Sequence, residues 1–386
     1  MKTKRLLIYF LFVCAFSALS SNAAELNFSA TADFMAGYAS DLDFRKDTSQ
    51  NRYYSGQRVK PKLDLIFSDR YAIITEFQFT NTDGTSASPY SSFSTNDNNF
   101  KILDSYLKIV SKEGRSLKFG YQNVELPSFT FGNPFFNGHT FALTTNGPIG
   151  ENTDLDFIVA HPIKTEDNMP DGGTTTMFGV VLDTRSDSAR FKPYLTYTTI
   201  DHNVNSPYEW ASAPDDEYTY ITAGGFAAEL YASDKTTIKM DMVYGDSNNP
   251  GPHHYEAKGG LSAILIEHKT KYGIPGIFAW QGSGNDTKLQ VHQDYGTLPS
   301  VAFERSFAPT RMAFKGSDTM GRDAYLTATG AGTAGVGFHI RDLSFVDNIT
   351  HVLRAAYIVG TSEKQGAARR LQPPYPALQE RAARAP

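Results

Sequence analysis

Arg115-Ser-Leu-Lys-Phe-Gly-Tyr-Gln-Asn-Val124, continuing as Glu125-Leu-Pro-Ser-Phe-Thr-Phe-Gly-Asn-Pro-Phe-Phe-Asn-Gly138, is the stretch that decides the fold. Successive side chains of a β-strand point to opposite faces, so the first part predicts a strand with two unlike faces. One face suits lipid and the other suits water: the apolar side carries Leu117, Phe119 and Tyr121, and the polar side carries Ser116, Lys118 and Gln122. The proline and glycine residues of the second part predict a loop after this strand.

The same alternation recurs along most of the chain. It predicts strands at Leu26–Tyr38, Lys62–Ser68, Tyr71–Phe79, Ile102–Val110, Asp154–Ala160, Thr176–Leu182, Phe191–Thr199, Tyr218–Tyr231, Thr237–Tyr244, Gly260–Glu267, Gly335–Leu343 and His351–Val359. Most of these approach the roughly 9 to 11 residues of a tilted membrane strand. Their connections alternate between short turns and long polar loops, which is the pattern of outer-membrane β-barrels.

One such segment would fit a half-exposed strand of a soluble β-sandwich, whose apolar face packs on a second sheet. Repetition of the pattern behind an export signal, with 27 Phe and 21 Tyr, favours a membrane barrel instead. We therefore expect an all-β fold, a transmembrane antiparallel β-barrel of about 14 to 16 strands. We expect it to occupy residues 24–365. A soluble periplasmic or secreted all-β binding protein is the alternative.

The N-terminus has the form of an export signal. Met1-Lys-Thr-Lys-Arg5 precedes an apolar run from Leu6 to Leu19, and small residues follow near Ala23. We expect residues 1–23 to be a cleaved signal peptide rather than a membrane anchor, because a spanning helix needs roughly 20 apolar residues. The only cysteine, Cys14, lies inside this segment. The exported chain would therefore have no disulfide, thiol nucleophile or cysteine metal site.

The charge and motif content argue against several classes of function. Without the three basic residues of the signal peptide, 33 basic residues remain against 41 acidic ones, a net charge of −8. Nucleic acid is not expected as a partner, because proteins that bind it concentrate positive charge against the phosphates. His253 and His254 follow Gly251-Pro252 in a predicted loop, and a zinc site usually needs three or four converging ligands. We expect neither enzyme activity nor a cofactor.

Charged side chains of both signs fall on the polar faces, where a water-filled lumen would keep them hydrated. On the lipid face, an Arg or Lys at the bilayer midplane would cost about 2 to 4 kcal/mol. Opposed rows of charge would also set the ion selectivity of a pore. The expected lining residues are Lys62, Asp64, Glu76, Asp104, Lys108, Lys118, Asp156, Lys192, Lys239, Asp241, Arg341 and Arg354.

The segment from Glu125 to His139 is the predicted pore constriction. Its four phenylalanines should not hang in solvent, and folding the segment onto the inner wall would bury them and narrow the pore. Packing outward against a neighbouring subunit is the alternative. The expected constriction residues are Glu125, Phe129, Phe131, Asn133, Phe135, Asn137 and His139.

Two elements in this region, Gly120-Tyr-Gln-Asn-Val-Glu-Leu-Pro-Ser128 and Gly132-Asn-Pro134, resemble a motif of the bacterial outer-membrane homotrimeric porins. Weaker likenesses extend the resemblance over most of the chain, at Phe157–Pro162, Lys192–Leu195, Ala308–Arg311 and His351–Tyr357. The resemblance implies a homotrimer of barrels surrounded by the lipid of the bacterial outer membrane. It also implies passive diffusion of small hydrophilic solutes through each barrel.

Residues 366–386 depart from that family, whose barrels close with a final strand that ends in an aromatic residue. The tail carries four Pro and four Arg in 21 residues. Pro donates no hydrogen bond to a ladder, so this composition argues against a central strand. We interpret the tail as out of frame, in a chain that has lost its closing strand; a disordered periplasmic tail is the alternative.

Overall fold

The computed structural model describes most of the predicted barrel. The described residues are 24–39, 52–84, 99–162, 175–200, 219–248, 256–284, 296, 298–301, 307, 309, 332–346 and 349–361. The predicted signal peptide and the tail at 366–386 lie outside this set. The described part of the chain contains no helix with the length and apolarity to traverse a bilayer.

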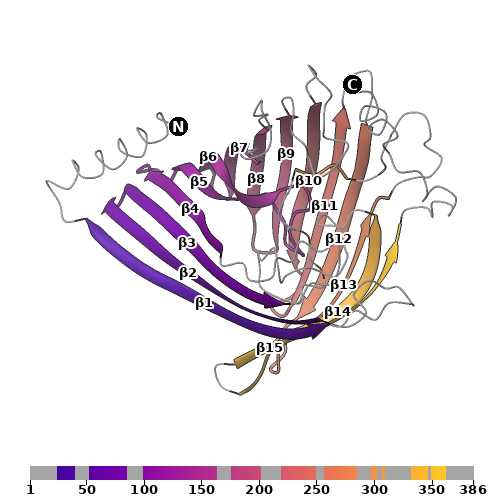
Figure 1. Cartoon of the computed structure of the whole chain (residues 1–386). Helices are drawn as coiled ribbons and strands as arrows, with labels where there is room; N and C mark the ends of the chain where they lie inside the picture. Colours follow the sequence, from indigo (N-terminus) through magenta and orange to yellow (C-terminus); the bar gives the residue numbers. More distant parts are fainter. Residues whose placement is uncertain are drawn as a thin grey trace, which may run out of the picture.

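Fifteen antiparallel strands form one sheet, which confirms the prediction of an all-β fold with about 14 to 16 strands (Figure 1). Their bounds are β1 Glu25–Ala39, β2 Arg52–Ser68, β3 Tyr71–Gly84, β4 Asn99–Val110, β5 Ser116–Glu125, β6 Asn137–Gly150, β7 Thr153–His161, β8 Thr175–Arg185, β9 Ala189–Ile200, β10 Thr219–Tyr231, β11 Thr236–Asn248, β12 Glu256–His268, β13 Ile274–Gly282, β14 Thr333–Val346 and β15 Ile349–Gly360.

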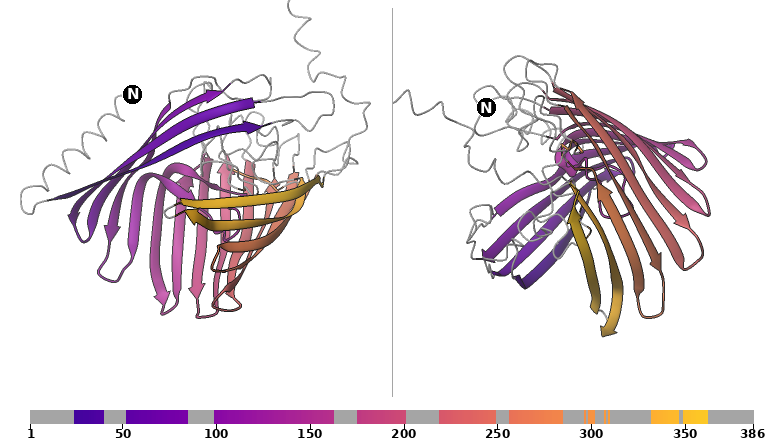
Figure 2. Two further views of the ribbon diagram at one scale, coloured as in Figure 1. Left: turned by 90° about the horizontal axis from the view of Figure 1, so that it is seen from below. Right: turned by 90° about the vertical axis from the view of Figure 1, so that its right-hand side faces the viewer.

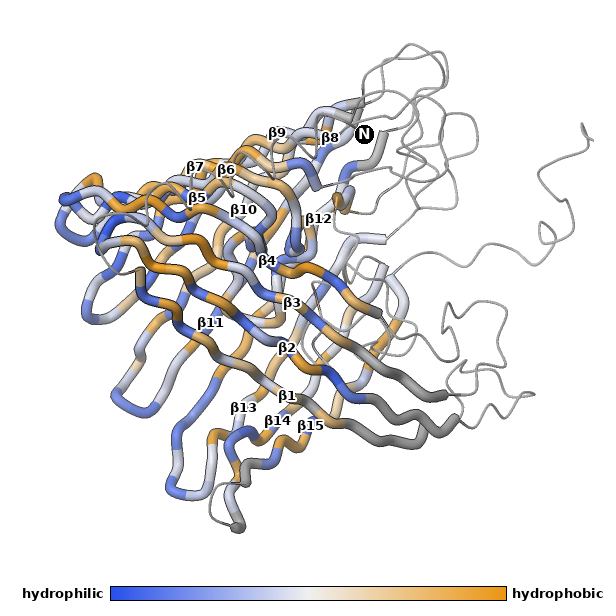
Figure 3. The backbone as a smooth tube through the Cα atoms, turned by 60° about the vertical axis from the view of Figure 1, so that its left-hand side comes forward, coloured by the Kyte–Doolittle hydropathy of each residue, from blue (hydrophilic) through white to orange (hydrophobic). Residues whose placement is uncertain are grey.

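The sheet is a meander in which every strand pairs with its neighbours in sequence. Strands alternate in hydropathy along their length, and the short turns at one end are hydrophilic (Figure 3). Local side chains close these turns: in the β4–β5 turn the Ser111 hydroxyl accepts hydrogen bonds from the backbone N–H of Glu113 and of Arg115. Gly114 there has φ +79°, a left-handed conformation that glycine adopts without strain. The predicted alternation of short and long connections is present.

The two edges of the curved sheet are β1 and β15 (Figure 2). No ladder between them is present among the described residues, so the sheet is not closed there. In an antiparallel meander of 15 strands, the first and last strands run in the same direction. A direct ladder between them would be parallel, whereas one further strand could pair with both in antiparallel fashion.

Two strands were missed by the sequence prediction. β6 contains Pro148 and three glycines, and β13 begins Ile274-Pro-Gly, so both looked like turns. The presence of β6 corrects the bounds of the predicted loop. Glu125 pairs with Asn137 in the ladder between β5 and β6, so the connection itself is shorter, from Leu126 to Phe136.

Candidate pore lining and constriction

The connection from Leu126 to Phe136 lies on the concave face of the sheet, here called the inner face (Figure 2). It reaches from β5 to β11, where Asp241 accepts four hydrogen bonds from it. The donors are the Ser128 hydroxyl at 2.5 Å, the Phe129 N–H at 2.9 Å, the Thr130 N–H at 3.0 Å and the Thr130 hydroxyl at 2.5 Å. We call Leu126–Phe136 the inner segment. Its attachment to a strand more than a hundred residues away fixes it across the inner face.

Asn133 holds the inner segment in a second place. Its side-chain amide donates to the Pro127 carbonyl at 3.0 Å and to the Tyr194 hydroxyl on β9 at 2.8 Å. Its side-chain oxygen accepts from the Phe135 N–H at 2.9 Å. Asn133 is only 3% exposed and Phe135 is 0% exposed, so both side chains are used in packing and present almost no surface to a solute.

Two phenylalanines of the inner segment contact the wall. The Phe131 ring makes an edge contact with Phe278 of β13, with centroids 5.0 Å apart. Phe129 lies beneath two cations of β9, with the Arg190 guanidinium 5.5 Å and the Lys192 ammonium 5.9 Å from the ring centroid. These contacts spread the attachment of the segment over β9, β11 and β13.

A dry cluster beneath the inner segment was not predicted. The inner face of β8 to β13 is apolar at mid-height, where we had expected water-facing polar side chains. Buried members include Met177, Val181, Ile221, Ala223, Val243, Leu261, Leu265, Phe278 and Trp280. The inner segment covers this part of the wall together with Leu298, Val301 and Phe307, so these side chains form a small hydrophobic core between two layers of chain.

Three expected constriction residues lie in strands instead of in the loop. Asn137 and His139 belong to β6, and Glu125 ends β5. The His139 Nδ1 lies 3.5 Å from a carboxylate oxygen of Asp104, at the point where β4 and β5 separate. Glu125 is exposed and accepts a hydrogen bond from the Asn123 amide at 2.9 Å. These residues therefore lie in the strands that flank the inner segment, at the end of β5 and the start of β6.

Expected lining residues gather in two ion clusters near the short turns. In the first, the buried carboxylate of Asp183 on β8 contacts Arg185 at 2.7 Å, Arg190 at 2.5 Å and Lys192 at 3.1 Å. Lys192 was predicted to line the lumen, but Asp183 and its two arginines were not. Each carboxylate oxygen can accept more than one charge-assisted bond, which is how one anion serves three cations.

The second ion cluster joins β11, β12 and β14. Its centre is Glu267, whose carboxylate contacts Lys239 at 3.0 Å, His339 at 3.0 Å and Arg341 at 2.6 Å. Lys239 and Arg341 were predicted as lining residues, and the structure brings them together on one carboxylate. In both clusters the cations outnumber the central carboxylate, so both are net positive.

The other expected lining residues are dispersed over the wall. Lys62 pairs with Asp64 on the same strand at 3.1 Å, and Arg354 donates to the Pro309 carbonyl at 2.9 Å. The Asp156 carboxylate accepts a hydrogen bond from the Asn146 amide. Three remaining predicted residues lie in strands β3, β4 and β5, namely Glu76, Lys108 and Lys118.

The opposite, outward face exposes large apolar side chains at mid-strand. Leu195 is 59% exposed, Met242 50% and Ile277 61%. Aromatic side chains flank them: Tyr197 and Tyr220 stack with centroids 6.2 Å apart at the loop end, and Phe191 is 44% exposed toward the turn end. An apolar band flanked by aromatic side chains is typical of the outer surface of a membrane β-barrel.

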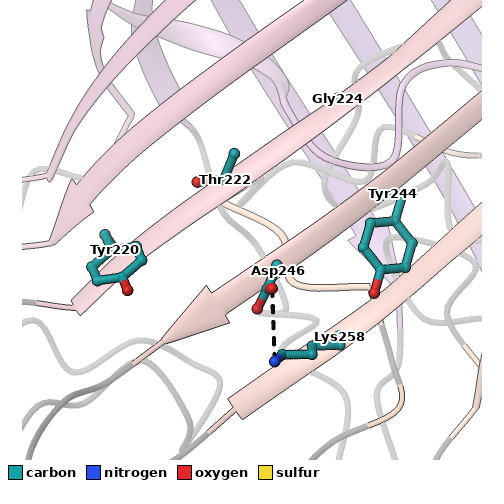
Figure 4. A pocket seen from close by; sticks show the side chains of 6 residues that line it. All are labelled: Tyr220, Thr222, Gly224, Tyr244, Asp246 and Lys258. Carbon is teal, nitrogen blue, oxygen red and sulfur yellow. Dashed lines mark ion pairs between the residues drawn. The ribbon is translucent and has the colours of Figure 1, made fainter.

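A hollow in this outward face lies at the loop end of β10 to β12 (Figure 4). Tyr220, Thr222 and Gly224 line one side, and Tyr244 lies opposite. Asp246 and Lys258 form an ion pair of 3.8 Å across adjacent strands. Because Ile221 and Ala223 point to the inner face, this hollow is no part of the candidate lumen. Among the described residues, no group of three or more potential ligands could hold a metal ion.

Comparison with known proteins finds a likeness to solved structures only. No family model and no curated protein matches the chain. The chain is structurally similar to bacterial outer-membrane porins over most of its length. A Salmonella typhi OmpF complex with daunomycin aligns with 88% of this chain and 98% of that one, at 10% identity and a TM-score of 0.46. A triple mutant of the Rhodopseudomonas blastica porin aligns with 87% of this chain and 95% of that one, at 9% identity and a TM-score of 0.45. OmpT of Vibrio cholerae aligns with 73% of this chain and 95% of that one, at 13% identity and a TM-score of 0.36.

Proposed function

We propose that this chain is a porin of the bacterial outer membrane, through which small hydrophilic solutes and ions diffuse passively. The observation that carries the proposal is the contrast between the two faces of the sheet. The outward face exposes apolar side chains, while the inner face carries ion clusters and the inner segment. A soluble β-sandwich would bury its apolar face against a second sheet.

The dimensions of the outward face fit a bilayer. On β10, the outward-facing Tyr220 and Leu230 are ten residues apart, which is about 33 Å along a strand at about 3.3 Å per residue. With a tilt of roughly 40° this corresponds to about 25 Å across the membrane. The apolar band of an outer-membrane barrel is about 25 Å tall, so the outward side of β10 is long enough to span it.

The inner segment is proposed as the constriction. It crosses the inner face from β5 to β11, and its hold on Asp241, Tyr194 and Phe278 keeps it in one place. The side chains that a passing solute would meet are those on its exposed side and the ion clusters of the wall. Selectivity would then depend on the charges left unpaired there.

The test is single-channel current across a planar bilayer containing the detergent-extracted, refolded chain. The comparison variant replaces residues 132–137 by a short Gly-Ser linker. Stepwise current that becomes larger in the variant would support both the porin and its constriction. Extraction from membranes and heat-dependent gel mobility separate the alternative, because a soluble all-β binding protein would show neither.

A homotrimer is proposed on the motif resemblance alone. Chemical cross-linking of the extracted protein should give a species of three times the mass of one chain. A single-chain mass under conditions that preserve the barrel would contradict the trimer and would leave the channel proposal standing.

A further inference from the structure

The described inner wall contains one pair of lysines whose charge is not matched by a carboxylate. Lys108 on β4 and Lys118 on β5 face each other directly in the ladder. No ion pair joins either of them to an acidic residue in the part of the chain that the structure describes. The neighbouring contact of Lys118 is with an aromatic ring, its ammonium lying 5.6 Å from the centroid of Tyr106.

The contrast with the other inner-wall lysines is sharp. Lys62 pairs with Asp64, Lys192 with Asp183 and Lys239 with Glu267, each at 3.0 to 3.1 Å. Like charges placed directly opposite on adjacent strands destabilise a sheet, because their Cβ atoms are only about 4.5–5.5 Å apart. Two opposed lysines without a carboxylate therefore form a site where an added anion would remove repulsion as well as gain attraction.

The two lysines line a pocket of about 540 Å³ on the inner face. Its other polar walls include Ser116, Gln122 and Asp156. The Gln122 side chain is fixed, because its amide donates to the Ala142 carbonyl at 3.0 Å and its oxygen accepts from the Thr144 hydroxyl at 3.1 Å. The two lysine ammoniums are the cationic donors of the pocket, with three N–H groups each.

We propose that Lys108 and Lys118 form a binding subsite for a small oxyanion, either a phosphate group or a carboxylate group of a solute. Both ammoniums can reach one oxyanion and donate charge-assisted hydrogen bonds to it. Two carboxylates also line the pocket, Asp156 on β7 and Glu125 at the end of β5, and each repels an anion from its own side. The subsite is thereby confined to the lysine side. This inference rests on the proposed function, because the pocket would face the lumen of the porin.

The experiment is equilibrium dialysis of the refolded full chain, in detergent micelles at low salt, against labelled inorganic phosphate and separately against labelled succinate. The test variant is Lys108→Gln with Lys118→Gln. The matched control is Lys258→Gln, which removes a lysine paired with Asp246 on the outward face. We expect saturable binding by the native chain and about tenfold weaker binding for each lysine removed. We expect the control to bind as the native chain does.

Binding of phosphate alone or of succinate alone supports the subsite and tells which group it takes. Equal binding by the double variant and the native chain overturns the subsite. Absence of saturable binding by a native chain of verified β-structure also overturns it. Current without anion binding would overturn the subsite while leaving the channel intact. Anion binding without current would support the subsite and count against the channel.

Discussion

Removal of the Asp241 carboxylate should release the inner segment. Asp241→Ala deletes the acceptor of four hydrogen bonds and leaves the N–H groups of Phe129 and Thr130 without it. Bonds to a charged group contribute about 1.5–3 kcal/mol each, but they are not additive and water can replace part of them in a lumen. We therefore expect docking of the segment to weaken by about 2–4 kcal/mol. That is roughly a 30- to 1000-fold larger undocked population.

Two measurements would detect the release of the inner segment. Hydrogen exchange of the peptide covering 126–136 should accelerate, and the single-channel current should rise or become noisier as the segment moves. The control is Asp246→Asn, on the same strand β11 but on the outward face, where its partner is Lys258. Unchanged exchange and unchanged current in Asp241→Ala would refute the assignment of Asp241 as the anchor. The aromatic contact of Phe131 with Phe278 would then be sufficient alone.

Three further substitutions test the wall and the membrane face. Leu195→Arg places a charge on the outward face and should cost about 2–4 kcal/mol of folding free energy, which lowers the fraction of chain assembled in vesicles. The control is Thr222→Arg nearer the loop end, which should cost about 0–1 kcal/mol. Asp183→Ala removes the carboxylate that three partly exposed cations share and should lower stability by about 1.5–3 kcal/mol in a urea titration. The exposed Asp187→Ala is the control. In Gly120→Ala the new Cβ would clash with the Ser105 carbonyl oxygen, and the backbone there has φ +136°, so the same titration should show a loss of about 1–3 kcal/mol.

Alternation of polar and apolar side chains was enough to predict most strands, because a two-residue period can be recognised within a short stretch of sequence. It failed where glycine and proline interrupt the pattern, as Pro148 does in β6 and Pro275 in β13. Pairing with the neighbouring strands makes these segments strands despite their local propensity, and a single sequence does not reveal that pairing.

The buried apolar cluster on the inner face of β8 to β13 could be recognised only weakly in the sequence. β8 reads Met177-Phe-Gly-Val-Val-Leu182, which is apolar on both faces, and such a run is typical of a strand covered on both sides. The partner that covers it is set by tertiary contacts: Ser128 and Asp241 lie 113 positions apart and no local pattern pairs them. The inward fold of the segment was predicted from the need to bury its phenylalanines. That argument could not predict Asp241 as its anchor.

The free edges of the sheet make a last prediction. In hydrocarbon, each unsatisfied backbone group costs several kcal/mol, so a chain inserted in a bilayer must join the edges at β1 and β15. Cysteines introduced by Ala30→Cys on β1 and Ala355→Cys on β15 should be linked by a flexible bismaleimide within one chain after insertion. Each single variant serves as the control. A product of twice the chain mass would show that the edges join between copies. No cross-link in membrane-inserted protein would contradict the argument that the edges must meet, and with it the assignment of these strands to the hydrocarbon region.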